Sequence, residues 1–481
     1  MKTAYIIRYV GMVLLLNAAF MLLSAVIGLF YGVDTGTFPL MLSFIITVAV
    51  GLFPMIYVPS KATLTSKDGY IIVIVSWITS CLMGMLPYVV WGGEFSLVDA
   101  WFESTSGFTT TGATILNNVE ALPHSLLFWR ASTHWIGGVG VVLFTLVVLP
   151  SVGRQRVTLS SVEISSMAKD NFRYNSRKIL SIILIVYVGL TLLETVLLRF
   201  AGMSLFDAIT HSFSTMATGG FSNKNLSIMA YNSLAIEIII MIFMLLAGVH
   251  FGLIYSTITG KGTSMWKNEV SRYYFLTMII GGALIALNLF FSGNYDDIGS
   301  SLRYGIFQTI SYGTTTGFAS ANDAFWPPFS VLLLIVLSMQ CAMAGSTTGG
   351  LKADRVLLLL KSIKLRVLKM QHPNAVRRVK LGGYAQDDQA IQMATVLIGF
   401  YLVAVVISTA FLTLFDIDLM TSFSATVASI GNVGPGFGKV SNLANMEFFN
   451  PVIKVWLSIL MLFGRLELFG LIHLFMIRSW R

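Results

Sequence analysis

Four stretches of the sequence share one pattern and decide the fold: LVDAWFESTSGFTTTGATI at 97–115, LFDAITHSFSTMATGGFSN at 205–223, LRYGIFQTISYGTTTGFAS at 302–320 and LMTSFSATVASIGNVGPGF at 419–437. Each is a moderately apolar segment followed by a glycine-containing turn, and each is too short to cross a bilayer as a helix. Aligned on one glycine, they place Gly112, Gly219, Gly317 and Gly434 in register, so the pattern recurs roughly every hundred residues. The repetition predicts four copies of one structural unit.

The composition indicates that most of the chain lies in a lipid bilayer. Of its 481 residues, 56% are hydrophobic and only 11% are charged. A soluble domain cannot bury that much apolar surface, and runs of the roughly 20 apolar residues that span a membrane recur throughout. We expect ten spanning helices, near residues 5–30, 39–58, 70–92, 125–150, 178–200, 233–258, 273–292, 328–365, 390–415 and 450–478.

The predicted fold is an all-α polytopic membrane protein with four tandem repeats. Each repeat consists of a first helix (M1), a short re-entrant pore loop and a second helix (M2). Non-helical backbone at membrane depth survives only inside protein or against water, so we expect the loops to surround one pore in a pseudo-fourfold arrangement. The expected parts are an N-terminal two-helix extension at 1–66 and repeats at 67–152, 175–262, 270–370 (with a broken M2 helix) and 388–481.

The charges predict the orientation of the chain. The net charge is +9, and Lys and Arg concentrate at 151–178 and 352–381, whereas 93–125 contains acidic residues and no Lys or Arg. The positive-inside rule explains this distribution without nucleic-acid binding and places both termini in the cytoplasm. The two cysteines, Cys81 and Cys341, lie in apolar runs and indicate helix packing rather than a disulfide framework or metal site.

The four short stretches have the chemistry of a cation filter. Rings of backbone carbonyls can replace the hydration shell of K⁺, glycine allows the positive φ that such a turn needs, and the C-terminal ends of short helices favour a cation. A single copy is weak evidence, since small residues also pack helices, but four copies in the same context favour the filter. The candidate K⁺-binding residues are Thr110, Thr111, Gly112, Ala217, Thr218, Gly219, Thr315, Thr316, Gly317, Asn432, Val433 and Gly434.

The motifs FESTSGFTTTGAT, STMATGGFS, SYGTTTGF, GSTTGGLK, HPNAV, GNVGPG and MLFGRLELF resemble those of the Trk-type potassium uptake proteins (the TrkH and TrkG group), over essentially the whole chain. The resemblance implies K⁺ uptake across the bacterial cytoplasmic membrane by a homodimer with one pore in each protomer. It also implies a separate, cytoplasmic, nucleotide-binding regulatory subunit of the TrkA type, and no covalently bound cofactor. The second loop departs from the pattern at Met216 and Ala217, and the fourth at Asn432, Val433 and Pro435.

The eighth span contains a candidate gate. Residues 328–365 would form a helix of about 57 Å, against a hydrocarbon core of about 30 Å. Two alternatives are a tilted, kinked helix and, preferred here, two half-helices joined by a loop in the pore. That loop would comprise residues with poor helix propensity, namely Gly345, Ser346, Thr347, Thr348, Gly349 and Gly350.

Arg465 is the second candidate gate element. An arginine this deep in a membrane is costly unless it faces water or a partner. A salt bridge to Glu467 is one alternative, although residues two apart on a helix do not face each other. Arg465 lies 31 positions after Gly434, as Thr348 does after Gly317, so both are expected below the filter. The Trk resemblance implies that this arginine and the loop control gating. His250, 31 positions after Gly219, is either a helix-packing donor or a pore-lining residue.

Two other functions were weighed against a channel. A membrane enzyme would need clustered His, Cys, Asp or Glu, which the sequence does not show, so no enzyme activity is expected. A proton- or sodium-coupled symporter is the alternative, because Glu103, Glu194 and Glu237 leave room for coupling. The basic stretch at 352–381 is expected to dock a regulatory subunit or to contact lipid headgroups.

Overall fold

The computed structural model describes residues 3–59, 66–151, 176–260, 264–374 and 377–466. Within them the chain is helical, apart from one hairpin in which β1 (Lys380–Leu381) pairs antiparallel with β2 (Tyr384–Ala385). The predicted helical class is therefore correct. Most of the basic stretch at 151–178, together with Glu467 and the C-terminal arginines, lies outside the described residues.

Six helical segments of the described chain are long and apolar enough to cross a membrane, and they coincide with six predicted spans. These helices make the chain a multi-pass membrane protein. They are α1 (Thr3–Phe30), α2 (Thr37–Tyr57), α3 (Ser66–Gly84) with its continuation α4 (Leu86–Trp91), α9 (Ser176–Phe200), α13 (Glu269–Phe291) and α17 (Asp388–Thr413). Two further helices lie at predicted spans: α6 (His124–Ser151) occupies the span at 125–150, and α19 (Pro451–Arg465) forms the first part of the span at 450–478, whose residues from 467 on lie outside the described part of the chain.

Two of the predicted spans are broken. The span at 328–365 divides into α15 (Pro328–Gln340) and α16 (Ala353–Gln371), so the alternative of one kinked helix is wrong. The span at 233–258 divides into α11 (Leu234–Ala247) and α12 (Phe251–Thr259), which meet at an angle of 103°. The sequence predicts only the first of these breaks.

Four short helices begin in the same way. They are α5 (Leu97–Phe108), α10 (Leu205–Met216), α14 (Ile298–Gly313) and α18 (Leu419–Gly431). In each, the residue before the helix is Ser or Asp, and its side chain accepts a hydrogen bond from the backbone N–H three positions later. This cap satisfies a backbone donor that the first helical turn leaves unpaired. The four capping residues are Ser96, Ser204, Asp297 and Asp418.

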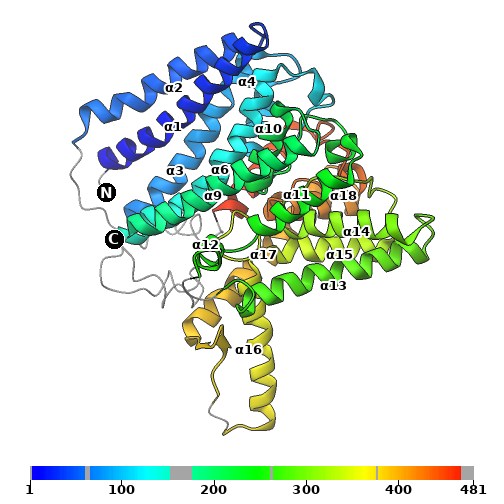
Figure 1. Cartoon of the computed structure of the whole chain (residues 1–481). Helices are drawn as coiled ribbons and strands as arrows, with labels where there is room; N and C mark the ends of the chain where they lie inside the picture. The colour runs from blue at the N-terminus through cyan, green and yellow to red at the C-terminus, as the bar shows by residue number, and fades with distance from the viewer. Residues whose placement is uncertain (1–2, 60–65, 152–175, 261–263, 375–376, 467–481) are drawn as a thin grey trace.

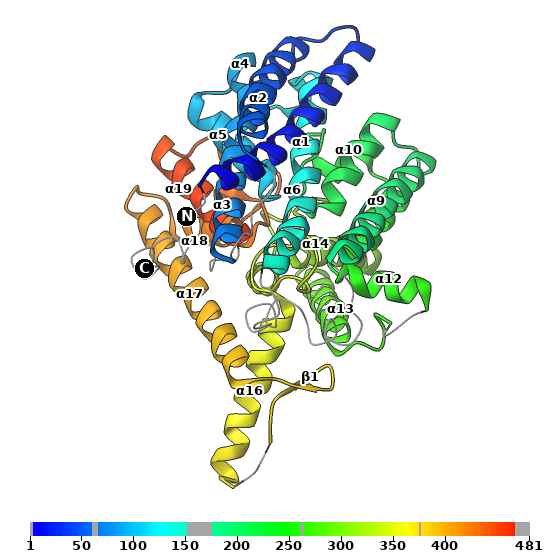
Figure 2. The ribbon, with the colours of Figure 1, turned by 90° about the vertical axis from the view of Figure 1, so that its left-hand side faces the viewer.

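The helices form one body from which a single arm extends. Figure 2 shows α16, followed by the β1 hairpin, projecting away from the other helices, with α17 leading back. The N-terminal pair α1 and α2 lies at the opposite side and packs on α3 and α6 (Figure 1). The short 3-10 helices η1 (Val119–Ala121), η2 (Ser227–Tyr231) and η3 (Gly438–Val440) lie in the connections that follow three of the glycine turns.

The turn between α1 and α2 caps the start of α6. The carboxylate of Asp34 accepts hydrogen bonds from Ser125 N (2.8 Å) and Ser125 Oγ (2.6 Å), and Thr37 Oγ1 donates to it at 3.0 Å. The Tyr31 ring stacks on His124, with 4.0 Å between centroids. The N-terminal extension therefore supplies from a distance the capping group that the first turn of α6 requires.

We predict that Asp34→Ala destabilises the protein by about 1–2 kcal/mol, the usual cost of losing a helix cap. Thermal unfolding of the detergent-purified protein measures the change as a lower Tm. Asp296→Ala, which removes an exposed acid from the connection before α14, is the matched control and should leave Tm unchanged. Equal Tm values for all three proteins would contradict the capping role.

Candidate functional site

The segments that follow the four short helices, here called the glycine loops, share an unusual backbone conformation. In the first three loops the second residue after the helix has a positive φ, and in the fourth loop the first residue does. These four φ angles are 52° to 56°, although none of the residues is glycine. Left-handed backbone of this kind is uncommon outside glycine and marks a constrained site. The four residues are Thr110, Thr218, Thr315 and Asn432.

Backbone geometry corrects the predicted register of the second loop. Two residues after each left-handed residue comes a glycine with φ between 80° and 94°, and in the second loop this glycine is Gly220 rather than Gly219. The hydrogen bonds agree, since Gly219 N donates to Ser214 O (2.8 Å) as Thr111 N donates to Ser106 O (2.9 Å). The residues of the second loop that correspond to Thr110, Thr111 and Gly112 are therefore Thr218, Gly219 and Gly220, and Ala217 lies one position earlier. The sequence held a signal for this: Gly112 and Gly220 each lie six positions after a serine, Ser106 and Ser214.

The four loops contact one another in a closed cycle. A Cβ atom added to Gly112 would overlap the carbonyl oxygen of Gly219, so no side chain fits between these loops. The same relation connects each loop to the next, and the fourth returns to the first. The other three pairs are Gly220 with Thr316 O, Gly317 with Val433 O and Gly434 with Thr111 O. The carbonyl that precedes each glycine therefore lies directly against the neighbouring loop.

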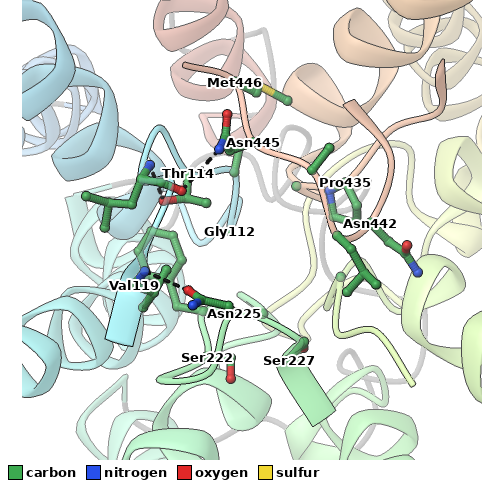
Figure 3. Close-up of a pocket in the computed structure, with 18 of the residues that line it drawn as sticks. Gly112, Thr114, Val119, Ser222, Asn225, Ser227, Pro435, Asn442, Asn445 and Met446 are labelled. Carbon is green, nitrogen blue, oxygen red and sulfur yellow. Dashed lines mark hydrogen bonds between the residues drawn. The ribbon is translucent and has the colours of Figure 1, made fainter. Parts of the chain in front are cut away.

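Beyond the glycines the loops line a polar pocket (Figure 3). Its wall is held together by side chains that bridge consecutive loops. The amide of Asn225 accepts from Val119 N at 2.7 Å, and Asn445 Nδ2 donates to Asn117 Oδ1 at 2.8 Å. Asn442 Nδ2 donates to Ala321 O at 2.7 Å in the same manner. These hydrogen bonds hold together the four chain segments that follow the glycine loops.

A buried ion pair borders the pocket, since Arg130 is one of the lining residues. Arg130 Nε is 2.6 Å from Glu103 Oε1, and its Nη1 donates to Ser222 O at 3.0 Å. Glu103 also accepts from Ile115 N, so the pair joins α5, α6 and the second glycine loop. The arginine is buried but paired, which meets the usual requirement for a charge in a low-dielectric setting. A second acid considered above, Glu237, is similarly paired with Arg303 at 2.8 Å.

Glu194 differs from these two acids. It lies on α9 and is fully buried. Neither carboxylate oxygen makes a hydrogen bond within the described part of the chain, although the Thr215 hydroxyl lies nearby. An ionised carboxylate without a partner is costly at such a position.

The residues between α15 and α16, 341–352, form a loop that lies against the other side of the glycine loops; we call it the intramembrane loop. Thr347 Oγ1 donates to Met216 O at 3.0 Å, and Gly349 N donates to Thr315 Oγ1 at 3.3 Å. A Cβ added to Gly349 would lie 2.6 Å from Asn432 Oδ1. The intramembrane loop thus contacts the second, third and fourth of the four units.

Arg465 holds this loop from α19. Its Nη1 donates to Thr347 O at 2.6 Å and its Nη2 donates to Gly137 O, on α6, at 2.9 Å. The side chain is only 4% exposed. Arg465 and the stretch 345–350, which were expected at a similar depth below the filter, are thus in direct contact through Thr347 O. The alternative partner, Glu467, lies outside the described residues.

The break between α11 and α12 pairs with the intramembrane loop. Met343 N donates to Gly248 O at 3.1 Å and Phe251 N donates to Gly345 O at 3.3 Å, so each interruption supplies partners for the other. His250 caps α12, since its Nδ1 accepts from Gly252 N at 3.0 Å. Neither predicted role of His250 describes this acceptor role, and its ring packs against Gly345.

The arrangement suits the passage of a cation. Carbonyl and hydroxyl oxygens converge where four loops meet, and the C-terminal ends of α5, α10, α14 and α18 immediately precede those loops, which favours positive charge there. Among the described residues, no group of three or more His, Cys, Asp or Glu side chains could hold a metal ion. The two cysteines are buried and unbridged.

Comparisons with known proteins agree with this geometry. The model of the TrkH family, described as cation transport protein, matches residues 37–479. The chain is 35% identical to the Trk system potassium uptake protein TrkH of Salmonella typhimurium, over 99% of both chains. It is 32% identical to TrkG of Escherichia coli, over 98% of this chain and 97% of that one.

A solved structure is similar over the full length. The crystal structure of the potassium transporter TrkH from Vibrio parahaemolyticus superposes with a TM-score of 0.90 and 31% identity, covering 100% of each chain. Sequence and fold therefore lead to the same assignment. This chain belongs to the TrkH family of cation transport proteins.

Proposed function

We propose that the protein is a potassium-selective channel or transporter subunit that mediates K⁺ uptake across the bacterial cytoplasmic membrane. The observation that carries the proposal is the closed cycle of glycine–carbonyl contacts among the four loops. A cycle of four related loops leaves an axis lined by backbone oxygens, which is the arrangement that replaces the hydration shell of K⁺. The relatives whose names specify potassium uptake support the choice of ion.

The filter in this proposal consists of three layers of residues in the corrected register. Thr110, Thr218, Thr315 and Asn432 form the layer nearest the intramembrane loop. The next layer is Thr111, Gly219, Thr316 and Val433, and the outer layer is Gly112, Gly220, Gly317 and Gly434. Layers of this kind present successive oxygens to a dehydrated ion.

The surrounding architecture in the proposal is four M1–pore-loop–M2 repeats in pseudo-fourfold arrangement, preceded by the N-terminal pair. Ten spanning helices with both termini in the cytoplasm account for the six apolar spans, the two broken ones, α6 and α19. The recurrence of a short helix followed by a glycine loop, at α5, α10, α14 and α18, supports the repeat assignment.

The gate is the intramembrane loop together with Arg465. The guanidinium lies between Thr347 O and Gly137 O, so it connects the loop to α6 from the side of the filter where ions would leave. A fixed positive charge on the ion path repels K⁺, and a loop that contacts three of the four units obstructs it.

Regulation by a separate TrkA-type subunit, and assembly as a homodimer, are proposed from the family. The arm formed by α16 projects from the helical body (Figure 2) and exposes Lys364, Arg366 and Lys369, which suits docking at the cytoplasmic face. Two of the nine basic residues at 352–381, Lys352 and Arg355, are buried and do not contribute to that surface.

A coupled symporter is the second candidate, and Glu194 is the observation that favours it. Of the three acids considered, Glu103 and Glu237 are paired with arginines, whereas Glu194 has no counter-charge at hydrogen-bonding distance among the described residues. Unpaired acids inside membranes often belong to proton pathways.

We predict that Gly220→Ser lowers the K⁺/Na⁺ permeability ratio by about tenfold, corresponding to ~1.4 kcal/mol, as Gly112→Ser does. Both substitutions force a side chain against the carbonyl of the next loop at a positive φ. Gly219→Ser is the comparison variant within the same filter loop. Its side chain would overlap the His134 ring rather than a carbonyl of the next loop, and Gly219 has no positive φ, so this variant should retain more selectivity. Bi-ionic reversal potentials measure the ratio. A larger loss of selectivity in Gly219→Ser than in Gly220→Ser would favour the register predicted from the sequence, with Gly219 equivalent to Gly112.

We predict that Arg465→Ala raises basal K⁺ flux. Two like charges about 8 Å apart repel by about 2 kcal/mol at an effective dielectric constant near 20, which corresponds to about thirtyfold in rate. Removing part of 345–350 should also raise flux while retaining selectivity. The measurement is rubidium uptake into proteoliposomes, normalised to folded protein, with Arg366→Ala on the exposed arm as the control. Flux at or below wild type in both gate variants would refute the gate and leave the filter untouched.

We predict that Glu194→Gln preserves K⁺ flux and that a pH gradient does not drive K⁺ uptake in either protein. Glutamine keeps the shape of the side chain and removes the cost of an unpaired charge. Proteoliposomes with a pH gradient and no K⁺ gradient provide the assay. Accumulation driven by protons in the wild type and lost in Glu194→Gln would establish the symporter.

A further inference from the structure

The intramembrane loop reaches the glycine loops chiefly through one residue, Gly349. Its N–H donates to Thr315 Oγ1 at 3.3 Å. Its Cα lies so close to the fourth loop that a Cβ there would be 2.6 Å from both Gly431 O and Asn432 Oδ1. Both Thr315 and Asn432 are the left-handed residues of their loops. The loop therefore contacts the innermost layer of the proposed filter itself.

That innermost layer contains oxygens without hydrogen-bond partners. Thr110 Oγ1 and Asn432 Oδ1 are buried, and neither has a partner among the described residues. Thr218 Oγ1 donates to Ala217 O at 2.7 Å, which leaves its lone pairs available. The innermost layer thus holds three threonine hydroxyl oxygens and the side-chain amide oxygen of Asn432. Of these four oxygens, the hydroxyl oxygen of Thr315 is the one that accepts a hydrogen bond from the intramembrane loop.

The Gly349 N–H and a K⁺ ion would both have to use the lone pairs of Thr315 Oγ1. Each places positive charge against its lone pairs, and K⁺ is bound only by oxygens. A K⁺ ion coordinated by Thr315 Oγ1 would lie next to the positive end of the Gly349 N–H dipole, which repels it. The two occupants therefore exclude or strongly weaken each other.

From this geometry we propose that K⁺ at the innermost filter layer and the closed intramembrane loop compete for Thr315 Oγ1, so that K⁺ arriving from the cytoplasmic side promotes opening of the gate. The inference rests on the proposed function, since it requires both the filter and the gate. It adds a regulatory role for the transported ion and makes Thr315 the positioning residue that connects the two.

Mass action sets the size of the effect. A ligand that binds only the open state multiplies the open-to-closed ratio by 1 + [K⁺]/Kd, where Kd is the dissociation constant of the inner site. Raising K⁺ from well below Kd to ten times Kd is therefore expected to increase the open-to-closed ratio about tenfold.

Asn432 connects the innermost filter layer to the helix that carries Arg465. Its Nδ2 donates to Thr111 Oγ1 at 3.0 Å and to Met461 O at 2.9 Å. Met461 lies one turn before Arg465 on α19, and Arg465 holds Thr347 O of the loop. The innermost layer is thus joined to the loop directly through Gly349 and indirectly through α19.

The test is single-channel recording of the full-length protein in planar bilayers. Cytoplasmic K⁺ is varied at constant ionic strength, with N-methyl-D-glucamine as the replacement cation. In the wild type, closed times should shorten as K⁺ rises. Thr315→Val keeps the side-chain shape without the hydroxyl, so closed times should become shorter and independent of K⁺. Thr315→Ser, which keeps the hydroxyl, should restore the dependence.

A second variant tests the same contact without substituting a residue of the filter. Gly349 has no positive φ, so Gly349→Ala acts by overlap with Gly431 O and Asn432 Oδ1. It should also shorten closed times and abolish their K⁺ dependence, and it carries the test if Thr315→Val does not fold.

Closed times that ignore K⁺ in the wild type, or that keep their K⁺ dependence in Thr315→Val or Gly349→Ala, overturn the inference. If Arg465→Ala still raises flux in that case, the gate stands and only the competition is lost. If the wild-type protein shows no discrete single-channel openings, the proposal that it is a channel is refuted as well.

Discussion

The structure depends on one backbone constraint: each of four glycines lies against the carbonyl oxygen of the following loop, in a cycle that closes on itself. Because no Cβ fits at these positions, the loops approach one another more closely than side chains would allow. The identical caps on the four preceding helices, and the asparagine bridges beyond the glycines, hold the loops in the positions that this cycle requires.

Interrupting a helix inside a membrane leaves backbone groups without partners, which costs several kcal/mol each unless they are satisfied. Here two interruptions satisfy each other: the break between α11 and α12 pairs with the loop between α15 and α16 through Gly248, Met343, Gly345 and Phe251. This pairing explains why a second broken helix exists. The loop also depends on single hydrogen bonds to Thr315 and Met216 and on Arg465.

Much of the site could be predicted from sequence because its signals are local and repeated. Four short apolar stretches with glycine turns, a span too long for one helix and an arginine at matching depth are visible in the letters alone. The register of the second loop was wrong because Gly219 and Gly220 are adjacent, and only backbone φ distinguishes them. The break at Gly248–His250 was missed because the run 233–258 is predominantly apolar and long enough for a single span, and the partner of the break lies about a hundred residues away. The Asp34 cap on α6 is equally distant in sequence and leaves no local pattern.

The basic side chains inside the helical body have two kinds of contact, carboxylates and backbone carbonyls, which the sequence does not distinguish. Arg130, Arg303 and Lys454 each pair with a carboxylate at 2.6–2.8 Å, and these pairs brace the scaffold around the loops. The two hydrogen bonds of Arg465 described above go to carbonyl oxygens on two different elements. By donating to both carbonyls, the guanidinium joins the intramembrane loop to α6 and α19. The ion pairs of Arg130, Arg303 and Lys454 connect helices of the scaffold to one another. Arg465 instead connects the scaffold to the intramembrane loop, a role that its position in the sequence does not reveal.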